Sequence, residues 1–116
     1  MQYALLIYQG TTPLPDSEAW AALSADEQQA IYADYAALNA TPGVTPGLPL
    51  GLPEKATTVR VADGEVQATE GPYAEPIGGY LVLEADDLDA AVALAARIPA
   101  ARHGGAIEIR PVERYW

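Results

Sequence analysis

Two short segments of this chain are apolar at nearly every position, and they restrict the fold more than any other feature. They are QYALLIY (residues 2–8) and IGGYLVLEA (residues 77–85). Successive side chains of a strand point to opposite faces, so a strand that is apolar at both odd and even positions must be covered on both faces. Each segment is followed by a stretch with helical character. The chain therefore predicts two strand–helix units that share one sheet.

The first helical stretch has clear start and stop signals. A short helix over residues 17–22 is expected to lead into a longer helix over residues 25–39, which ends before Pro42-Gly43. Ser24 and Glu27 have the S-x-x-E spacing, in which each side chain accepts a hydrogen bond from the backbone N–H of the other residue. A core-facing stripe on the longer helix is expected at Ile31, Tyr35 and Leu38.

The second helical stretch, DDLDAAVALAARIPAAR, begins directly after the second apolar strand. Its aspartates suit a helix N-terminus, where they accept hydrogen bonds from free backbone N–H groups and interact favourably with the helix dipole. We expect Leu88, Val92 and Ala95/Ala96 to face the core and Pro99 to end the helix.

Four further strand segments complete the pattern, and one of them is weak. TTVRV and EVQAT flank Asp63-Gly64 and predict a β-hairpin with a tight turn. Residues 40–53 contain four prolines and three glycines, so only a short strand near residues 48–52 is expected there, because proline cannot donate to a β-ladder. The segment GAIEIRPV (residues 105–112) alternates apolar and polar residues and predicts the last strand.

This order of elements predicts an α+β fold of the ferredoxin-like βαββαβ type with an inserted β-hairpin. Right-handed crossovers place both helices on one face of a four-stranded antiparallel sheet. The 116 residues have room for one such domain, and we assign residues 1–116 to it. The other sheet face is then a bare apolar surface larger than the few hundred Å² that monomers tolerate. We therefore expect a homodimer packed sheet to sheet, a dimeric α+β barrel.

Composition excludes several classes of function. Acidic residues outnumber basic ones by 16 to 6, and without a basic cluster the chain is not expected to bind nucleic acid. Cysteine is absent and histidine occurs once, which excludes disulfides and argues against a metal site. No dinucleotide or P-loop spacing is present, so no cofactor is expected. The N-terminal segment lacks the features of a signal or membrane-spanning sequence, and a cytoplasmic protein is expected.

The antiparallel topology brings three segments to one rim of the sheet. The first strand ends at Tyr8, and the strand at residues 77–84 begins at the same rim. The last strand, which follows His103, begins there too. We therefore expect Tyr8, the EGPYAE loop (residues 70–75) and His103 to converge.

His103 is the main candidate for catalysis, because an imidazole titrates near neutrality and can act as a general acid or base. Glu75 is the preferred carboxylate to orient it, and Glu70 is the second choice. Alternatively, His103 caps the C-terminal turn of the preceding helix, where a positive charge is favoured by the helix dipole. The corresponding alternative for Glu75 is a solvated surface acid.

Three more residues are candidates for binding a substrate. Tyr8 and Tyr73 would either donate a hydrogen bond into a cleft or pack their rings in the dimer core. Arg102 would bind an anionic substrate group through a bidentate contact, or form a salt bridge with one of the many nearby acids. Glu70 would also contribute to the site. No Ser-His-Asp grouping is evident, and Ser17 and Ser24 are expected to act as helix caps.

Five blocks of sequence occur in a fixed order along nearly the whole chain: YALLIY, WAALSADEQ, TTVRVADGEVQATEGPYAE, GGYLVLEADDLDAAVALAARIP and ARHGGAIEIRP. This order resembles the YCII-related family, in particular its DGPF subgroup. The subgroup signature is represented here by the run Glu70, Gly71, Pro72 and Tyr73. Family members usually continue through a segment rich in threonine and lysine, whereas here only Pro76 and Ile77 separate Glu75 from the double glycine. This difference shortens one wall of the expected site.

The resemblance implies a dimeric ferredoxin-like fold and leaves the activity open. Some relatives are small-molecule enzymes, including a dehydrochlorinase of chlorinated aromatic breakdown with a His-Asp pair. DGPF proteins are also often encoded beside, or fused to, sigma factors. The first hypothesis is therefore an enzyme in which His103 moves a proton and Glu75 orients it, in elimination, isomerisation or hydrolysis. The alternatives are a non-catalytic dimeric module that binds a ligand or a sigma factor, and a relic that only dimerises.

Overall fold

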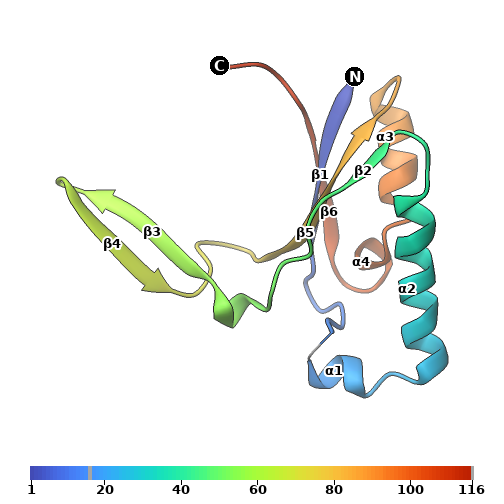
Figure 1. Ribbon diagram of the computed structural model, residues 1–116, viewed down its shortest axis with the longest axis horizontal. Coiled ribbons are helices and arrows are strands. Elements are labelled where there is room, and N and C mark those ends of the chain that lie inside the picture. Colours follow the sequence, from blue (N-terminus) through green and yellow to red (C-terminus); the bar gives the residue numbers. More distant parts are fainter. Residues whose placement is uncertain (16, 116) are drawn as a thin grey trace.

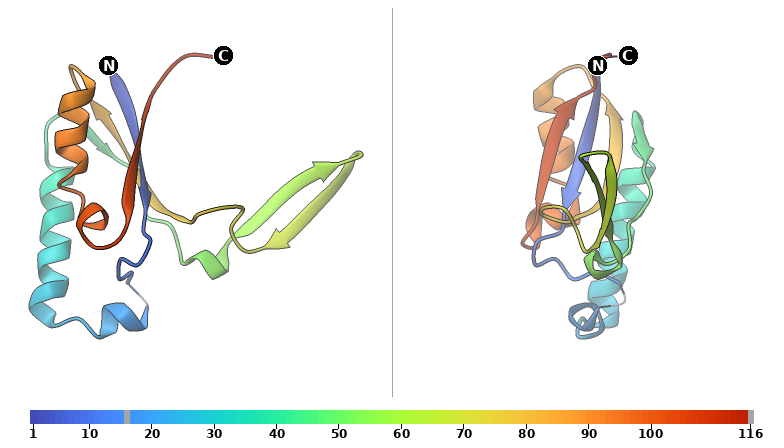
Figure 2. Two further views of the ribbon diagram at one scale, coloured as in Figure 1. Left: turned by 180° about the vertical axis from the view of Figure 1, so that it is seen from behind. Right: turned by 90° about the vertical axis from the view of Figure 1, so that its left-hand side faces the viewer.

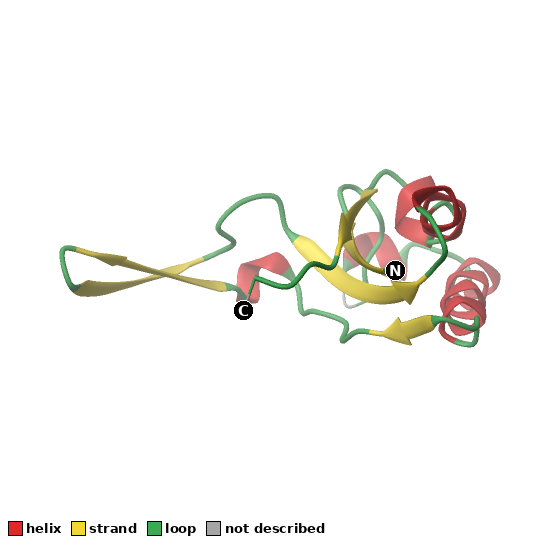
Figure 3. Ribbon diagram, turned by 90° about the horizontal axis from the view of Figure 1, so that it is seen from above, coloured by secondary structure: helices red, strands yellow, loops and turns green. Residues whose placement is uncertain are grey.

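The fold is built around a four-stranded antiparallel sheet, seen in a computed structural model that describes residues 1–15 and 17–115 (Figure 1). The sheet has the strand order β2-β5-β1-β6, which is the ferredoxin-like order. Its strands are β1 (Gln2–Tyr8), β2 (Val44–Pro46), β5 (Ile77–Glu84) and β6 (Ala106–Pro111). The helices lie on one face of this sheet, as Figure 3 shows from above. The expected α+β architecture is confirmed.

The core lies between the sheet and the helices, and β1 supplies its centre. Tyr3, Leu5 and Ile7 are buried, and Leu5 is fully inaccessible. Leu81 and Leu83 of β5 extend this cluster. The intervening residues of β1 point to the opposite face of the sheet and are only half-buried.

The first helical pair begins and ends where the sequence indicates. The helices are α1 (Glu18–Ala21) and α2 (Ala25–Asn39). Ser24 and Glu27 form both bonds of the capping box, each 3.1 Å long. The backbone N–H and the hydroxyl of Ser24 lower the pKa of the Glu27 carboxyl below its usual value. Leu38 of α2 is buried at 1% exposure, which confirms the inner end of the expected stripe.

The second helical stretch differs from the expectation in two ways. It forms α3 (Leu88–Ala95) and a separate α4 (Pro99–Arg102), and Pro99 begins α4 rather than ending α3. Proline suits the first turn of a helix, because the N–H that it lacks has no partner there. The expected inward stripe is only partly correct, since Ala95 is buried but Leu88 and Val92 are 53% and 51% exposed. The buried residues are Ala91, Leu94 and Ala95, so the inward face of α3 consists of two alanines and one leucine.

The prediction of a short strand near residues 48–52 is wrong, because β2 lies earlier, at Val44–Pro46. The chain beyond β2 still follows β5, with the N–H of Gly47 bonded to the carbonyl of Tyr80 and the N–H of Leu50 bonded to the carbonyl of Gly78. The prolines at 46 and 49 have no N–H and interrupt a regular ladder. A single 3₁₀ turn, η1 (Pro53–Lys55), then leads towards the hairpin.

The hairpin forms as the sequence predicts, but it does not join the main sheet. Its strands are β3 (Thr57–Ala62) and β4 (Glu65–Glu70), which form a separate two-stranded sheet. Asp63 and Gly64 both have positive φ, of 53° and 79°, as a tight hairpin turn requires. The hairpin projects from the side of the sheet opposite the helices (Figures 1 and 2). None of the helices in residues 1–15 and 17–115 is long and apolar enough to cross a membrane.

The loop after β1 packs tightly against the loop that contains His103. The N–H of Thr11 donates to the carbonyl of Gly104, and the hydroxyl of Thr12 donates to the carbonyl of His103, at 3.3 and 3.2 Å. Gly104 has a φ of 96°, which favours glycine. A Cβ on Gly105 would overlap backbone carbonyl oxygens, including that of Tyr8. Two glycines in series therefore permit this close approach at the rim.

The position of Leu38 predicts a large loss of stability on truncation. Leu38→Ala should lower the free energy of unfolding by about 2–5 kcal/mol, because it leaves a cavity between α2 and the sheet. The control is Leu88→Ala, the same change at a side chain that is 53% exposed, which should cost much less. Urea unfolding followed by circular dichroism measures both values. Equal losses at the two positions would contradict the described core.

The close approach at Gly105 predicts a second loss. Gly105→Ala should lower the free energy of unfolding by about 1–3 kcal/mol, because its Cβ has to displace backbone rather than a flexible side chain. Gly51→Ala is the matched control, since its nearest neighbour would be the Lys55 side chain at an ordinary 3.5 Å. Thermal and urea unfolding of the two variants provide the comparison, and a neutral Gly105→Ala would refute the loop contact.

Candidate functional site

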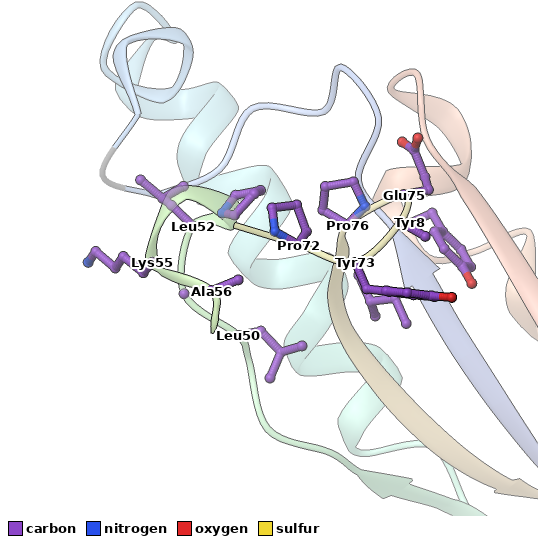
Figure 4. A pocket seen from close by; sticks show the side chains of 13 residues that line it. Tyr8, Leu50, Leu52, Lys55, Ala56, Pro72, Tyr73, Glu75 and Pro76 are labelled. Carbon is purple, nitrogen blue, oxygen red and sulfur yellow. The ribbon is translucent and has the colours of Figure 1, made fainter. Parts of the chain in front are cut away.

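A cleft of about 460 Å³ lies where the hairpin leaves the body, at the rim of the sheet (Figure 4). Three segments that are distant in sequence line it: Tyr8 of β1, the chain at residues 50–53 and 55–56, and the loop at residues 72–77. The register of the sheet explains their meeting, because Tyr8 pairs with Ile77 of β5 and with Ala106 of β6. Tyr8 and the loop that precedes β5 therefore converge, as the topology predicts.

The polar groups of the cleft lie at its two ends. Tyr8, Tyr73 and Glu75 come from one end, and Lys55 comes from the other, with its ammonium group directed outward (Figure 4). Glu75 is exposed and its carboxylate points away from the two tyrosine rings, as expected for a solvated surface acid. Leucine and proline side chains occupy the space between these ends. Lys55 and Glu75 are the only charged residues among those that line the cleft. The cleft thus offers an apolar and aromatic wall between a carboxylate and a cation.

The loop that carries Tyr73 and Glu75 is fixed to the base of the hairpin by hydrogen bonds. The N–H of Gly71 donates to the carbonyl of Ala56, and the hydroxyl of Thr58 donates to the carbonyl of Gly71, both at 2.8 Å. The Arg60 guanidinium lies over the Tyr73 ring, 5.6 Å from its centroid, as in a cation–π contact. Tyr73 is nevertheless 74% exposed, so its outer face is open to a ligand or to another protein.

A smaller cavity of about 70 Å³ adjoins the cleft, and Glu75 lines both. Gln9 also lines this cavity, and its side chain packs over Gly78. The Gln9 Oε1 atom is buried and has no hydrogen-bond donor among the residues that the structure describes. A buried acceptor without a donor is unfavourable, so a donor group that enters this cavity gains a hydrogen bond.

His103 lies at the C-terminal end of α4 and outside the residues that line the cleft. It is the C-cap residue, its N–H donates to the carbonyl of Ala100, and its side chain is exposed. Within the described part of the chain, its imidazole makes no hydrogen bond or ion pair with Glu75 or Glu70. The structure places His103 at the same rim as Tyr8, since the following strand pairs with β1. Its pairing with Glu75 stays a prediction.

Two other candidates lie away from the cleft. Arg102 donates to Asp34 at 2.7 Å, and this salt bridge joins α4 to α2, as the structural alternative expects. Both side chains are about half exposed, so the pair contributes little to stability. Glu70 is exposed at the end of β4 and does not line the cleft. No group of three or more potential metal-ligating side chains is found, leaving aside positions 16 and 116.

Lys55, Gln9 and the segment at residues 50–53 are not predicted from the sequence as parts of a site. Lys55 is the only lysine in the chain, which is a signal that the sequence contains. It follows a segment rich in proline and glycine, which lacks the hydrophobic periodicity from which a helix or a strand is predicted. Gln9 carries no pattern of its own and gains importance only through its position after β1.

Comparison with known families agrees with this architecture. The family model described as the YCII-related domain matches residues 1–115. No curated protein matches the chain. The match covers the sheet, the helices, the hairpin and every residue that lines the cleft. The chain therefore belongs to the YCII-related domain family.

Proposed function

We propose that this YCII-related protein is a small-molecule enzyme that moves a proton on a substrate held in the rim cleft. The observation that carries the proposal is the meeting of Tyr8, Tyr73 and Glu75 around a cleft of about 460 Å³. Ligand sites are commonly clefts of this size, with mostly apolar walls and a few convergent polar groups. The substrate class is a compound with an apolar or aromatic body and at least one polar group.

The residues divide between holding the substrate and moving a proton. The tyrosine rings and the apolar wall would bind the body of the substrate, and Lys55 would attract an anionic group at the far end of the cleft. The Glu75 carboxylate would act as a general base. It would take a proton from a substrate carbon in an isomerisation or an elimination, and from the attacking water in a hydrolysis. The proton would then pass to another atom of the substrate in an isomerisation, and to the leaving group in an elimination or a hydrolysis. Gln9 Oε1 would accept a hydrogen bond from a donor group of the substrate.

His103 is the second titratable group in the proposal. It follows α4 at the same rim and precedes the residue that pairs with Tyr8 by three positions. Its role would be to exchange the proton that Glu75 handles with solvent or with the substrate. In the hypothesis from the sequence, His103 moves the proton and Glu75 orients it. Here the roles are exchanged, because Glu75 lines the cleft and His103 does not.

Binding is tested first, with amide chemical shifts of the ¹⁵N-labelled protein during titration with phenols, benzoates and short aliphatic acids. At least one of these classes should shift amides at residues 50–56 and 72–77 and leave α2 unaffected. Tyr73→Ala should weaken that binding by about tenfold, because it removes one aromatic wall. Tyr32→Ala, on α2 and 52% exposed, is the control for loss of a tyrosine elsewhere. Shift changes confined to other surfaces would contradict the proposed site.

Catalysis is tested on whichever bound compound the protein converts. Glu75→Gln should lower kcat by about 10²–10⁴-fold with little change in KM, because the amide keeps the shape and cannot accept the proton. Glu70→Gln, a matched change outside the cleft, should leave kcat unaltered. His103→Ala should lower kcat and change its pH profile. An unchanged rate in Glu75→Gln would refute the mechanism, and an unchanged rate in His103→Ala would remove the histidine from it.

A further inference from the structure

The smaller cavity beside the rim cleft has a lining of its own. Its volume is about 70 Å³, and three segments line it: the loop after β1 at residues 9, 10 and 14, the chain at residues 51 and 53, and residues 75–78, which lead into β5. A single water needs roughly 10–15 Å³ of such a volume, so the cavity has room for a polar group of a few heavy atoms. Residues 51, 53 and 75–77 also line the cleft, so one molecule can occupy both spaces.

The Gln9 side chain lies over a bulge in β5. The register between β1 and β5 shifts between Ile7 and Tyr8 and skips Gly78. A Cβ at Gly78 would overlap the Gln9 side chain, so glycine is required for this placement. β-Bulges often lie beside binding sites, where they redirect a side chain. The irregularity of β5 thus makes room for the Gln9 amide at the wall of the smaller cavity.

The amide oxygen of Gln9 has no donor. Oε1 is buried, and within residues 1–15 and 17–115 no group donates a hydrogen bond to it. Gln28 on α2 is also partly buried, and there the amide is paired, because its Nε2 atom donates to the carbonyl of Trp20 at 2.9 Å. An unpaired buried acceptor is unfavourable and rare in folded proteins. The smaller cavity therefore has an acceptor that an incoming donor can satisfy.

The charges around the smaller cavity favour a cationic donor. Glu75 is the only charged residue among the described residues that line it, and Lys55 lines the cleft but not this cavity. The Glu75 carboxylate points away from the two tyrosine rings of the cleft (Figure 4). The formal net charge of the chain is −10, which also attracts cations. A primary ammonium group combines a positive charge with three N–H donors, and so matches an amide oxygen near a carboxylate.

The cleft determines what such an ammonium group is attached to. Between Glu75 and Lys55 its wall consists of leucine, proline and tyrosine side chains. Lys55 at the far end repels a positive charge, so a cationic amine with an apolar body is favoured in one direction, with its nitrogen at the end near Gln9. The two spaces together therefore select both the charged group and the body of the ligand.

We propose that the smaller cavity is an ammonium subsite, in which Gln9 Oε1 accepts a hydrogen bond from a primary ammonium group and Glu75 supplies the neighbouring negative charge. The ligand class is a primary amine with an aromatic or apolar body. Gln9 is the residue that determines specificity, because it provides the buried acceptor. The placement of the ligand body in the rim cleft rests on the proposed function, whereas the ammonium subsite does not.

Methylammonium tests the subsite alone, because it needs only the smaller cavity. Titrated at constant ionic strength into the ¹⁵N-labelled full chain, it should shift the amides of residues 9, 10, 75, 77 and 78 and leave α2 unaffected. Tetramethylammonium has the same charge but no N–H donor, and should not shift these amides. Equal shifts with the two ions, or none with methylammonium, would overturn the subsite.

Benzylamine and benzyl alcohol test whether the subsite and the cleft bind one molecule. Benzylamine should bind at least about tenfold more tightly than benzyl alcohol, because it adds charge to the donor. It should also shift amides at residues 50–56 and 72–75. Equal affinity for the two compounds at the cleft would overturn the amine as ligand class and leave the proposed function standing. Methylammonium shifts without any benzylamine shifts at the cleft would leave the subsite standing and contradict the proposed function.

Gln9→Met removes the acceptor and keeps the length of the side chain. It should weaken benzylamine binding by about tenfold and leave the thermal unfolding midpoint unchanged or higher, because an unpaired buried oxygen is lost. Gln28→Met is the matched control: it removes a formed hydrogen bond, so it should lower the midpoint and leave benzylamine binding unaltered.

Two results with these variants would overturn the role of Gln9. One is an unchanged benzylamine affinity in Gln9→Met. The other is a midpoint that falls in Gln9→Met as far as in Gln28→Met, since Oε1 would then be satisfied in the free protein. Glu75→Gln should also weaken methylammonium binding, whereas Glu70→Gln, at a carboxylate outside both cavities, should not. An equal effect of these two changes would remove Glu75 from the subsite.

Discussion

The pairing of β1 with β5 on one side and β6 on the other is the constraint on which the rest of the structure depends. Both partners are distant in sequence, so residues 2–8 join the two ends of the chain into one sheet. This pairing fixes which side chains reach the helices, because a shift of one residue would invert both faces. It also places Tyr8 between Ile77 and Ala106, and so creates the rim at which the cleft lies.

The same strand is also apolar on the face that the helices do not cover. Its odd-numbered residues pack with Leu81 and Leu83 under the helices, and its even-numbered residues place Leu6 and Tyr8 on the face of the sheet away from the helices. An antiparallel sheet can expose one face to water when that face is polar, and here it is apolar at its centre. The β3–β4 hairpin repeats this pattern on a smaller scale, with its valines on one face only. The buried core and the uncovered apolar face of the sheet are thus two consequences of one sequence pattern.

The sequence predicts most reliably what short-range chemistry determines. The capping box at Ser24 and the turn at Asp63-Gly64 are local, and both form as expected. The orientation of α3 is not determined locally, because the face with Ala91 and Leu94 is buried in the core, and this leaves Leu88 exposed. The position of β2 is mispredicted for a related reason. Its pairing is with β5, which is distant in sequence, so the residues around the prolines do not by themselves determine where the strand forms.

For the candidate site too, the topology of the sheet can be predicted from the sequence, whereas the directions of individual side chains cannot. Topology brings Tyr8 and the loop of Glu75 together, and the sequence contains that information. Whether His103 points into the cleft depends on the turn after α4, which no repeat pattern determines. Only two residues lie between Glu75 and Gly78, so the loop that contains Glu75 leads directly from the β3–β4 hairpin to β5. The backbone at Glu75 is therefore connected to the sheet on one side and to the β3–β4 hairpin on the other, while its side chain is exposed.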